Sequence, residues 1–281
     1  MSKDFLADMV ARRTARIAAE WGPLDPADRE RLACCARPPR PFAAVLSWRA
    51  DVAVIAEVKR ASPGAGPIAP ECEASKQALH YTGGGAAAIS VLTEPEVFGG
   101  SFADLSDVAD AVDVPVLAKD FVVDPVQLFV ARGHGADAVL LMVSVLGASV
   151  TDYLDLASTL GLEALMEVVD ERELDLAIAA GATLIGVNSR DLRTLELDPE
   201  RASRITTLAA EAGAVTVAAS GVKTRADVRA AASAGAHAVL VGETLMRADF
   251  PEDLLAELTG VARNVAARGP IARPSGSQHA E

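Results

Sequence analysis

The stretch Ile55-Ala-Glu-Val-Lys-Arg-Ala-Ser-Pro63 begins as an apolar run and ends in charged and turn-forming residues. Its first part has the composition of a buried strand. Glu57 and Lys59 are two residues apart, so on a strand their side chains point to the same face. Burying an acid and a base there costs free energy unless something pairs or uses them. The stretch therefore predicts a strand whose carboxyl end contributes to a functional site.

Seven more apolar runs follow this one, and segments with the apolar spacing of helices separate them. Near-continuous apolar strands that alternate with helices are typical of a parallel sheet covered on both faces. Eight such units in about 200 residues predict an α/β fold of the (β/α)8, or TIM barrel, type. The runs are Val52–Lys59, Ala86–Thr93, Val114–Phe121, Ala138–Val145, Glu163–Val169, Leu184–Arg190, Val215–Ser220 and Ala238–Glu243.

A doubly wound open sheet is the alternative for the same alternation of strands and helices. Dinucleotide-binding sheets of that type carry G-x-G-x-x-G after a strand, and none of the eight runs is followed by this motif. The three glycines at 83–85 precede a run, which indicates a turn from helix to strand rather than a phosphate loop. The barrel is therefore favoured.

The composition divides the chain into three parts. Residues 1–48 predict a helical extension, with Phe5, Met9 and Ile17 on one face of a first helix and a second helix after Asp25. Residues 49–262 are expected to form the barrel. Residues 263–281 are rich in Pro, Gly and Ser and are expected to be disordered, and no second barrel is expected beyond residue 262.

The formal net charge is −13 and the isoelectric point about 4.8, which argues against sequence-independent nucleic-acid binding. A small anionic ligand remains compatible, because a local basic site can form in an acidic protein. The three cysteines suggest neither a disulfide framework nor a metal motif. With no apolar signal region and no apolar run long enough to span a bilayer, we expect a cytoplasmic protein that does not enter the membrane.

Polar residues end six of the eight apolar runs. In a (β/α)8 barrel the carboxyl ends of the strands carry the active site, and few other arrangements would satisfy so many polar groups. Each residue alone has an ordinary alternative: Glu57 and Lys59 as a structural ion pair, Lys119 as a rim lysine, and Asn188 as a turn residue. Their occurrence together favours a site. The candidates are Glu57, Lys59, Lys119, Glu167, Asn188, Arg190, Ser220 and Glu243.

The last two runs end in Ser220-Gly221 and Gly242-Glu243, each followed by a segment of helical character. Loops after the seventh and eighth strands of these barrels commonly bind phosphate at a helix N-terminus. Glycine allows backbone N–H groups to approach a phosphate closely. Ordinary strand-to-helix turns are the alternative, but the lysines expected across the barrel favour phosphate.

Seven segments in order resemble the indole-3-glycerol-phosphate synthase family, from about residue 5 to 262. The first and sixth are the most specific of the series. The segments are Ile55–Pro63, Ser90–Thr93, Phe98–Ser101, Lys119–Phe121, Asp124–Pro125, Gly186–Leu192 and Val241–Met246.

The resemblance implies a lyase of tryptophan biosynthesis that needs no cofactor and no metal. The substrate would be the phosphorylated small molecule 1-(2-carboxyphenylamino)-1-deoxyribulose 5-phosphate, which loses CO2 and water as the ring closes. Lys119 would be the general acid, and Glu167 and Lys59 would serve the dehydration. Glu57 would orient and tune the lysines.

The resemblance also implies the remaining site residues. Asn188 and Arg190 would position the substrate, with Asn188 and Ser220 in the catalytic group. The N-terminal helices would lie over the barrel mouth, and Ser62 would begin a loop that folds over the site. The expected substrate- and phosphate-binding residues are Ser62, Phe98, Phe121, Arg190, Gly221, Gly242 and Glu243.

Two positions depart from the family. Ala118 stands where the family has Arg, and its parity relative to Lys119 predicts that it faces the helices. Ala219 stands where the family has a Glu that contacts the substrate. A paralogue acting on another arylamino-sugar phosphate is therefore an alternative, as are a related sugar-phosphate isomerase and a non-catalytic barrel that binds a phosphate ligand. A monomer or a homodimer is expected.

Overall fold

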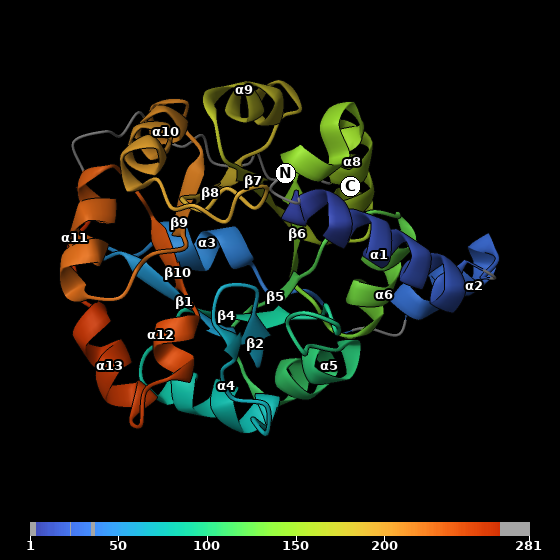
Figure 1. Ribbon diagram of the computed structural model, residues 1–281, viewed down its shortest axis with the longest axis horizontal. Coiled ribbons are helices and arrows are strands. Elements are labelled where there is room, and N and C mark those ends of the chain that lie inside the picture. The colour runs from blue at the N-terminus through green and yellow to red at the C-terminus, as the bar shows by residue number, and fades with distance from the viewer. Residues whose placement is uncertain (1–3, 23, 35–36, 265–281) are drawn as a thin grey trace, which may run out of the picture.

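The computed structural model describes residues 4–22, 24–34 and 37–264. Eight parallel strands close into one barrel, and helices surround it (Figure 1). The predicted (β/α)8 fold is therefore confirmed. Around the barrel the strands are β1 (Ala53–Val58), β4 (Ala88–Leu92), β5 (Val116–Lys119), β6 (Ala138–Met142), β7 (Glu163–Val168), β8 (Leu184–Asn188), β9 (Val215–Ala219) and β10 (Ala238–Val241), which pairs with β1.

Most of the helices lie between successive strands, and three precede β1 (Figure 1). A small antiparallel hairpin of β2 (Ala61–Ser62) and β3 (Gly66–Pro67), which the sequence did not predict, follows β1. The helices are α1 (Phe5–Trp21), α2 (Pro26–Cys34), α3 (Phe42–Ser47), α4 (Ala74–Gly83), α5 (Phe102–Ala111), α6 (Val126–Gly133), α7 (Val143–Leu146), α8 (Val150–Thr159), α9 (Glu171–Ala179), α10 (Pro199–Glu211), α11 (Arg225–Ser233), α12 (Glu243–Met246) and α13 (Pro251–Leu258).

The side chains of each strand alternate between two apolar clusters. In β1, Val54 and Ala56 pack in the layer between the sheet and the helices, while Ala53 and Ile55 pack inside the barrel. Glu57 continues the inward series, as the period of two predicts. Ala118 packs in the outer layer, which confirms its predicted parity. Lys119, the next residue, consequently points to the barrel interior, where it lines the cavity described below.

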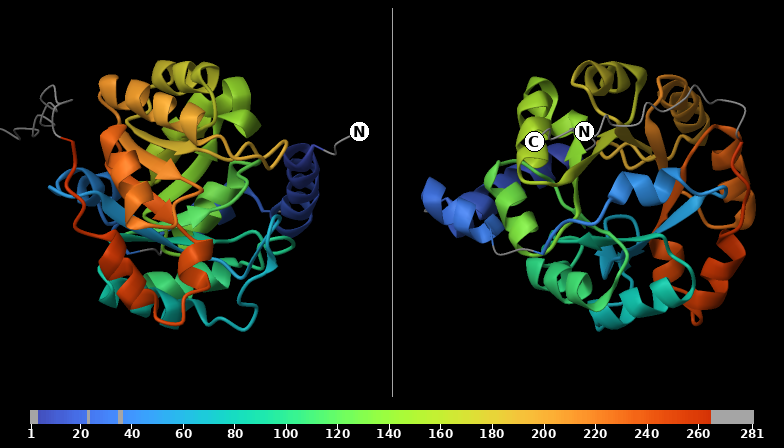
Figure 2. Two further views of the ribbon diagram at one scale, coloured as in Figure 1. Left: turned by 60° about the vertical axis from the view of Figure 1, so that its left-hand side comes forward. Right: turned by 180° about the vertical axis from the view of Figure 1, so that it is seen from behind.

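Of the three N-terminal helices, α1 and α3 lie at opposite ends of the barrel, whereas α2 packs against α6 on its outside and does not lie over the mouth. Helix α1 lies at the carboxyl ends of the strands, where Leu6 and Met9 pack with the interior cluster and the Phe5 amide donates to the Arg193 carbonyl. The expectation of a helix over the mouth therefore holds for α1. Helix α3 crosses the opposite end (Figure 2), and the Glu163 carboxylate at the start of β7 accepts bonds from the Phe42 and Ala43 amides at 2.6 and 2.9 Å.

The structure corrects two strand predictions and leaves another expectation outside its range. The run Ala238–Glu243 is a strand only as far as Val241, and Glu243 begins the short helix α12. The apolar run Ala138–Val145 is not one strand: β6 ends at Met142, and Val143 begins the short helix α7. Pairing with β7 ends at Met142 and Glu167, so β-branched residues beyond that point have no strand to pair with. The expected disorder of residues 263–281 falls almost entirely outside the described residues. Within the described part of the chain, no helix is long and apolar enough to cross a membrane.

We expect Phe42→Ala to lower the free energy of unfolding by about 3–5 kcal/mol, because the Phe42 ring is fully buried at the closed end of the barrel. Trp48→Ala is the matched control: Trp48 follows the same helix, but is 84% exposed, and its loss should cost less than about 0.5 kcal/mol. Urea unfolding measures both. Equal losses would contradict the assignment of α3 as part of the core.

Candidate active site

A cavity of about 730 Å³ opens at the carboxyl ends of the strands. This volume lies within the range of about 300–1,000 Å³ that is usual for small-molecule sites. Every residue that the sequence assigned to the site lines the cavity, although those residues come from strands and loops far apart in the chain. They are Glu57, Lys59, Ser62, Phe98, Lys119, Phe121, Glu167, Asn188, Arg190, Ser220, Gly221, Gly242 and Glu243.

The Glu57 carboxylate lies between two lysines. Its Oε1 is 2.8 Å from Lys59 Nζ, and its Oε2 is 3.8 Å from Lys119 Nζ. Burial by itself would raise the pKa of Glu57, but Lys59 and Lys119 outweigh burial and hold the pKa below its ordinary value. Glu57 is 3% exposed and therefore remains a buried carboxylate that orients two cations at the cavity wall.

Gly242 allows the end of β10 to pack against this pair. A Cβ atom at Gly242 would lie 2.4 Å from Glu57 Oε1 and 3.0 Å from Lys59 Nζ. Both distances are shorter than ordinary van der Waals contact. A side chain at this position would therefore displace the charged pair, so that Gly242 keeps both the Glu57–Lys59 contact and the backbone next to it in place.

A series of connected hydrogen bonds links the ends of β7, β8 and β9. Asn188 Nδ2 donates to Glu167 Oε1 at 3.1 Å, and Ser220 Oγ donates to Asn188 Oδ1 at 2.8 Å. The Arg190 amide donates to the same Oδ1 at 3.0 Å. Glu167 and Asn188 are nearly fully buried. Because each partner fixes the next, the Glu167 carboxylate is held in one orientation at the cavity.

The turn after β9 has an unusual backbone. Ser220 has φ of +66° and Gly221 has φ of +80°, both in the left-handed region. Ser189 Oγ donates to the Ser220 carbonyl at 3.0 Å and helps to hold this conformation. A non-glycine residue such as Ser220 is strained in this region. Residues strained in this way cluster at functional sites. The turn places Ser220 Oγ at the cavity.

Apolar side chains form the rest of the wall. The rings of Phe98 and Phe121 have centroids 6.1 Å apart and are inclined by 46°, so that they form an aromatic edge. Ala219, which packs in the barrel interior, adds only a methyl group to the wall at the end of β9. Leucines of the loop after β8 complete this wall; they are Leu192, Leu195 and Leu197.

The cavity is more basic than the protein as a whole. Three of the charged groups that line it are paired: Glu243 with Arg247, which also lines the cavity, and Asp120 with Arg13 of α1. Of the remaining charged groups that line the cavity, the cations are Lys59, Lys119, Arg190 and Lys223, and the carboxylates are Glu57 and Glu167. The excess of cations suits an anionic ligand in a chain whose formal net charge is −13.

Sequence reasoning missed Lys223, Arg247 and the Arg13–Asp120 pair. Lys223 lies on the loop after Gly221, and Arg247 directly follows the short helix α12, so their positions after the two expected phosphate turns were the available signal. Arg13 carried a clearer signal. The buried face of α1 consists of Leu6, Met9, Arg13 and Ile17, which places an arginine in an otherwise apolar stripe.

Comparisons with known proteins show which family this chain resembles. A family model described as "Indole-3-glycerol phosphate synthase" matches residues 6–258. The chain is 48% identical over 222 residues to a protein of that name from Mycobacteroides abscessus, covering 78% of this chain and 81% of the relative. It is 45% identical over 245 residues to one from Mycobacterium ulcerans, covering 87% of this chain and 89% of the relative.

Solved structures share the fold at much lower sequence identity. A structure described as 3-hexulose-6-phosphate synthase superposes with a TM-score of 0.59 at 18% identity, covering 74% of this chain and 98% of that chain. A thiamine phosphate pyrophosphorylase from Pyrococcus furiosus superposes with a TM-score of 0.57 at 16% identity, covering 74% and 93% of the two chains. At these identities the likeness concerns the barrel alone.

We expect Lys59→Met to raise the pKa of Glu57, because the nearer of its two cations is lost while burial remains. NMR titration of the carboxyl carbon measures this pKa. Lys223→Met is the control, since Lys223 lines the same cavity but is not among the causes of the Glu57 shift. An unchanged Glu57 pKa in Lys59→Met would contradict the electrostatic assignment.

Lys59→Met should also change how the stability of the protein depends on pH. The depressed pKa of Glu57 stabilises the native protein above the unfolded glutamate pKa of about 4.3, and this stabilisation disappears as pH falls through the lower folded value. The stability deficit of Lys59→Met should therefore be largest near neutral pH and shrink below about pH 4.

Proposed function

This chain belongs to the indole-3-glycerol phosphate synthase family, and we propose that it catalyses the decarboxylating and dehydrating ring closure of 1-(2-carboxyphenylamino)-1-deoxyribulose 5-phosphate. The product is indole-3-glycerol phosphate, an intermediate of tryptophan biosynthesis. The enzyme is accordingly a carboxy-lyase.

The observation that carries this proposal is the arrangement of proton-transfer groups on two sides of one cavity. Lys59 and Lys119 share the Glu57 carboxylate at the ends of β1 and β5. Glu167 and Asn188 lie at the ends of β7 and β8, on strands from the other half of the barrel. A substrate held between them meets an ammonium group on one side and an oriented carboxylate on the other, which general acid–base catalysis requires.

Ring closure begins when the aromatic carbon that bears the carboxylate attacks the ketose carbonyl carbon. Lys119 donates a proton to the carbonyl oxygen as the new C–C bond forms, because an unstabilised alkoxide would otherwise develop there. Loss of CO2 then returns the electron pair of its C–C bond to the ring. Glu57 holds Lys119 Nζ at the cavity wall from which the proton is donated.

The dehydration step removes the hydroxyl group that the first step created. It needs an acid for the departing oxygen and a base for the adjacent proton, roles that we assign to Lys59 and Glu167. Asn188 fixes the Glu167 carboxylate, and Glu57 fixes the Lys59 ammonium. The product water leaves as the pyrrole ring becomes aromatic.

The two charged ends and the ring of the substrate match the remaining walls of the cavity. We assign the phosphate to Ser220, Gly221, Gly242 and Glu243 at the ends of β9 and β10, with Lys59 nearby. The benzene ring packs against the aromatic edge formed by Phe98 and Phe121, and Arg190 and Asn188 position the substrate. Ser62, in the hairpin after β1, lines the cavity, and we assign it to the loop that covers the bound substrate.

Lys119→Met should lower kcat by at least about 100-fold, because a general acid contributes roughly 10²–10⁴ to the rate. Binding of the phosphorylated product should change little, since the phosphate groups lie at β9 and β10. Indole fluorescence follows turnover, and equilibrium titration follows product binding. Lys76→Met, an exposed lysine of α4 paired with Glu73, is the control. Retained turnover in Lys119→Met would refute the general-acid assignment.

Ala219 is the position where this chain lacks the carboxylate of its family. The residue packs in the barrel interior beside Asn188, its register partner on β8. If the missing carboxylate limits the native enzyme, Ala219→Glu should raise kcat several-fold on the carboxyphenylamino substrate. Ala118→Glu is the contrasting variant. Ala118 packs in the apolar layer on the outer face of β5, so a glutamate there should destabilise the protein without raising kcat. No gain with Ala219→Glu would show that this reading of Ala219 is wrong.

The location and assembly of the enzyme remain predictions. A cytoplasmic enzyme that is a monomer or a homodimer is consistent with the family and with the composition. Light scattering coupled to size-exclusion chromatography distinguishes the two assemblies.

A further inference from the structure

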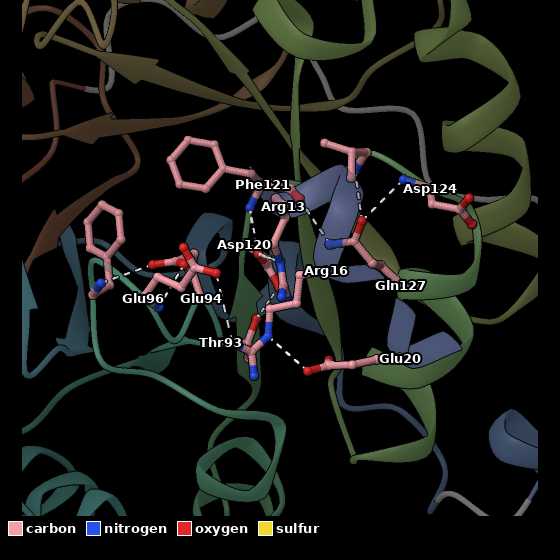
Figure 3. Close-up of polar contacts among 12 residues, drawn as sticks. Arg13, Arg16, Glu20, Thr93, Glu94, Glu96, Asp120, Phe121, Asp124 and Gln127 are labelled. Atoms are coloured by element: carbon pink, nitrogen blue, oxygen red, sulfur yellow. Dashed lines mark hydrogen bonds and ion pairs between the residues drawn. The ribbon is translucent and has the colours of Figure 1, made fainter. Parts of the chain in front are cut away.

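A buried ion pair connects helix α1 to the residue next to Lys119. Arg13 is 2% exposed and Asp120 is 6% exposed, and Arg13 Nε donates to Asp120 Oδ1 at 2.9 Å while Nη2 donates to Oδ2 (Figure 3). The Arg13 guanidinium also lies 5.9 Å from the centroid of the Phe102 ring. This two-pronged geometry is specific to arginine.

The Asp120 carboxylate accepts bonds from two distant segments of the chain and from the amide of the residue that follows it. Besides the two bonds from Arg13, it accepts one from Thr93 Oγ1 at 2.7 Å, beyond the end of β4, and one from the Phe121 amide at 2.8 Å (Figure 3). All of these donors are directed at one buried group. The carboxylate therefore fixes the relative positions of α1, the end of β4 and the end of β5.

The residues on both sides of Asp120 line the active-site cavity. Lys119 ends β5, and its carbonyl accepts a bond from the Thr93 amide at 3.1 Å. The Phe121 carbonyl accepts a bond from Gln127 Nε2 at 2.9 Å, so α6 holds the other end of the segment. With its backbone held at both ends, the Asp120 side chain sets the direction from which Lys119 and Phe121 enter the cavity.

The pair also controls the charge near Lys119. Burial raises the pKa of the Asp120 carboxyl, and Arg13 is the largest influence that opposes this rise. Without Arg13 the segment would contain either an unpaired buried carboxylate or a protonated carboxyl that donates a bond instead of accepting one. Either state disturbs the hydrogen bonds to Thr93 and Phe121.

We propose that Arg13 of helix α1 is a positioning residue for the reaction: by binding Asp120 it holds Lys119 and Phe121 in their productive orientations. This inference rests on the proposed function. The N-terminal helix is then part of the catalytic apparatus through one side chain, without contributing an atom that touches the substrate.

Arg13→Met tests this inference, because it keeps most of the apolar stem of the side chain and removes the guanidinium group. A displacement of the Lys119 segment should lower kcat by roughly 10- to 100-fold and change KM much less, since the phosphate groups lie on β9 and β10. Arg12→Met is the matched control. Arg12 lies on the same helix, but its side chain is 52% exposed and pairs with Asp8. The kcat and KM of Arg12→Met should equal those of the native enzyme.

Rescue experiments separate positioning from stability. Arg13→Lys keeps the positive charge but lacks the paired N–H donors of the guanidinium group, so it should recover only part of kcat. Added guanidinium should raise the kcat of Arg13→Ala, but leave Arg12→Met unaffected. In Arg13→Met/Asp120→Asn, which has no unpaired buried charge, the urea midpoint should recover while kcat remains low, because an amide cannot accept all the bonds of the carboxylate.

Four outcomes would overturn the inference. Native kcat in folded Arg13→Met shows that the pair does not position Lys119. A kcat that recovers together with the urea midpoint in the double variant shows a purely structural pair. A loss that appears in KM alone shows that the pair does not position Lys119 for the chemical step. A native enzyme that fails to turn over the carboxyphenylamino substrate overturns the proposed function itself and this inference with it. Native turnover with an unaffected Arg13→Met overturns this inference alone.

Discussion

The site depends on one buried carboxylate, Glu57, which is shared by two lysines. Neither cation nor carboxylate would be stable alone at the inner wall of a barrel, because transfer of an isolated charge out of water is costly. Together they remain charged, and burial makes their mutual attraction stronger than it would be in water. The glycine at 242 leaves the space that this arrangement needs, so the backbone of β10 is fitted to the charges of β1.

Lys119 lies at the junction of two electrostatic clusters. On the cavity side its ammonium group faces Glu57, and in the adjoining segment Asp120 faces Arg13 and Thr93. Lys119 ends β5 and Asp120 directly follows it, so one short segment serves both clusters. The reactive side chain is thus supported from outside the barrel by a helix that the barrel fold does not require.

Much of the fold and site followed from local sequence patterns. The alternation of apolar runs with helical segments predicts a closed parallel barrel, and the parity of Glu57 and Lys59 predicts their common face. The extent of some elements did not follow, because a β-branched run such as Val143–Val145 has high strand propensity whether or not a neighbouring strand is available. The family resemblance supplied the roles of individual residues, which spacing alone leaves open.

The sequence by itself determined the barrel, the strand ends that form the cavity and the chemical types of its groups, since these depend on periodicities within single segments. Only the tertiary structure decided which groups touch: the sharing of Glu57 by two lysines, the chain from Ser220 through Asn188 to Glu167, and the pairing of Arg13 with Asp120. The physical reason is distance along the chain. Arg13 and Asp120 are 107 residues apart, and no local pattern records which buried charge will meet which partner when the barrel closes.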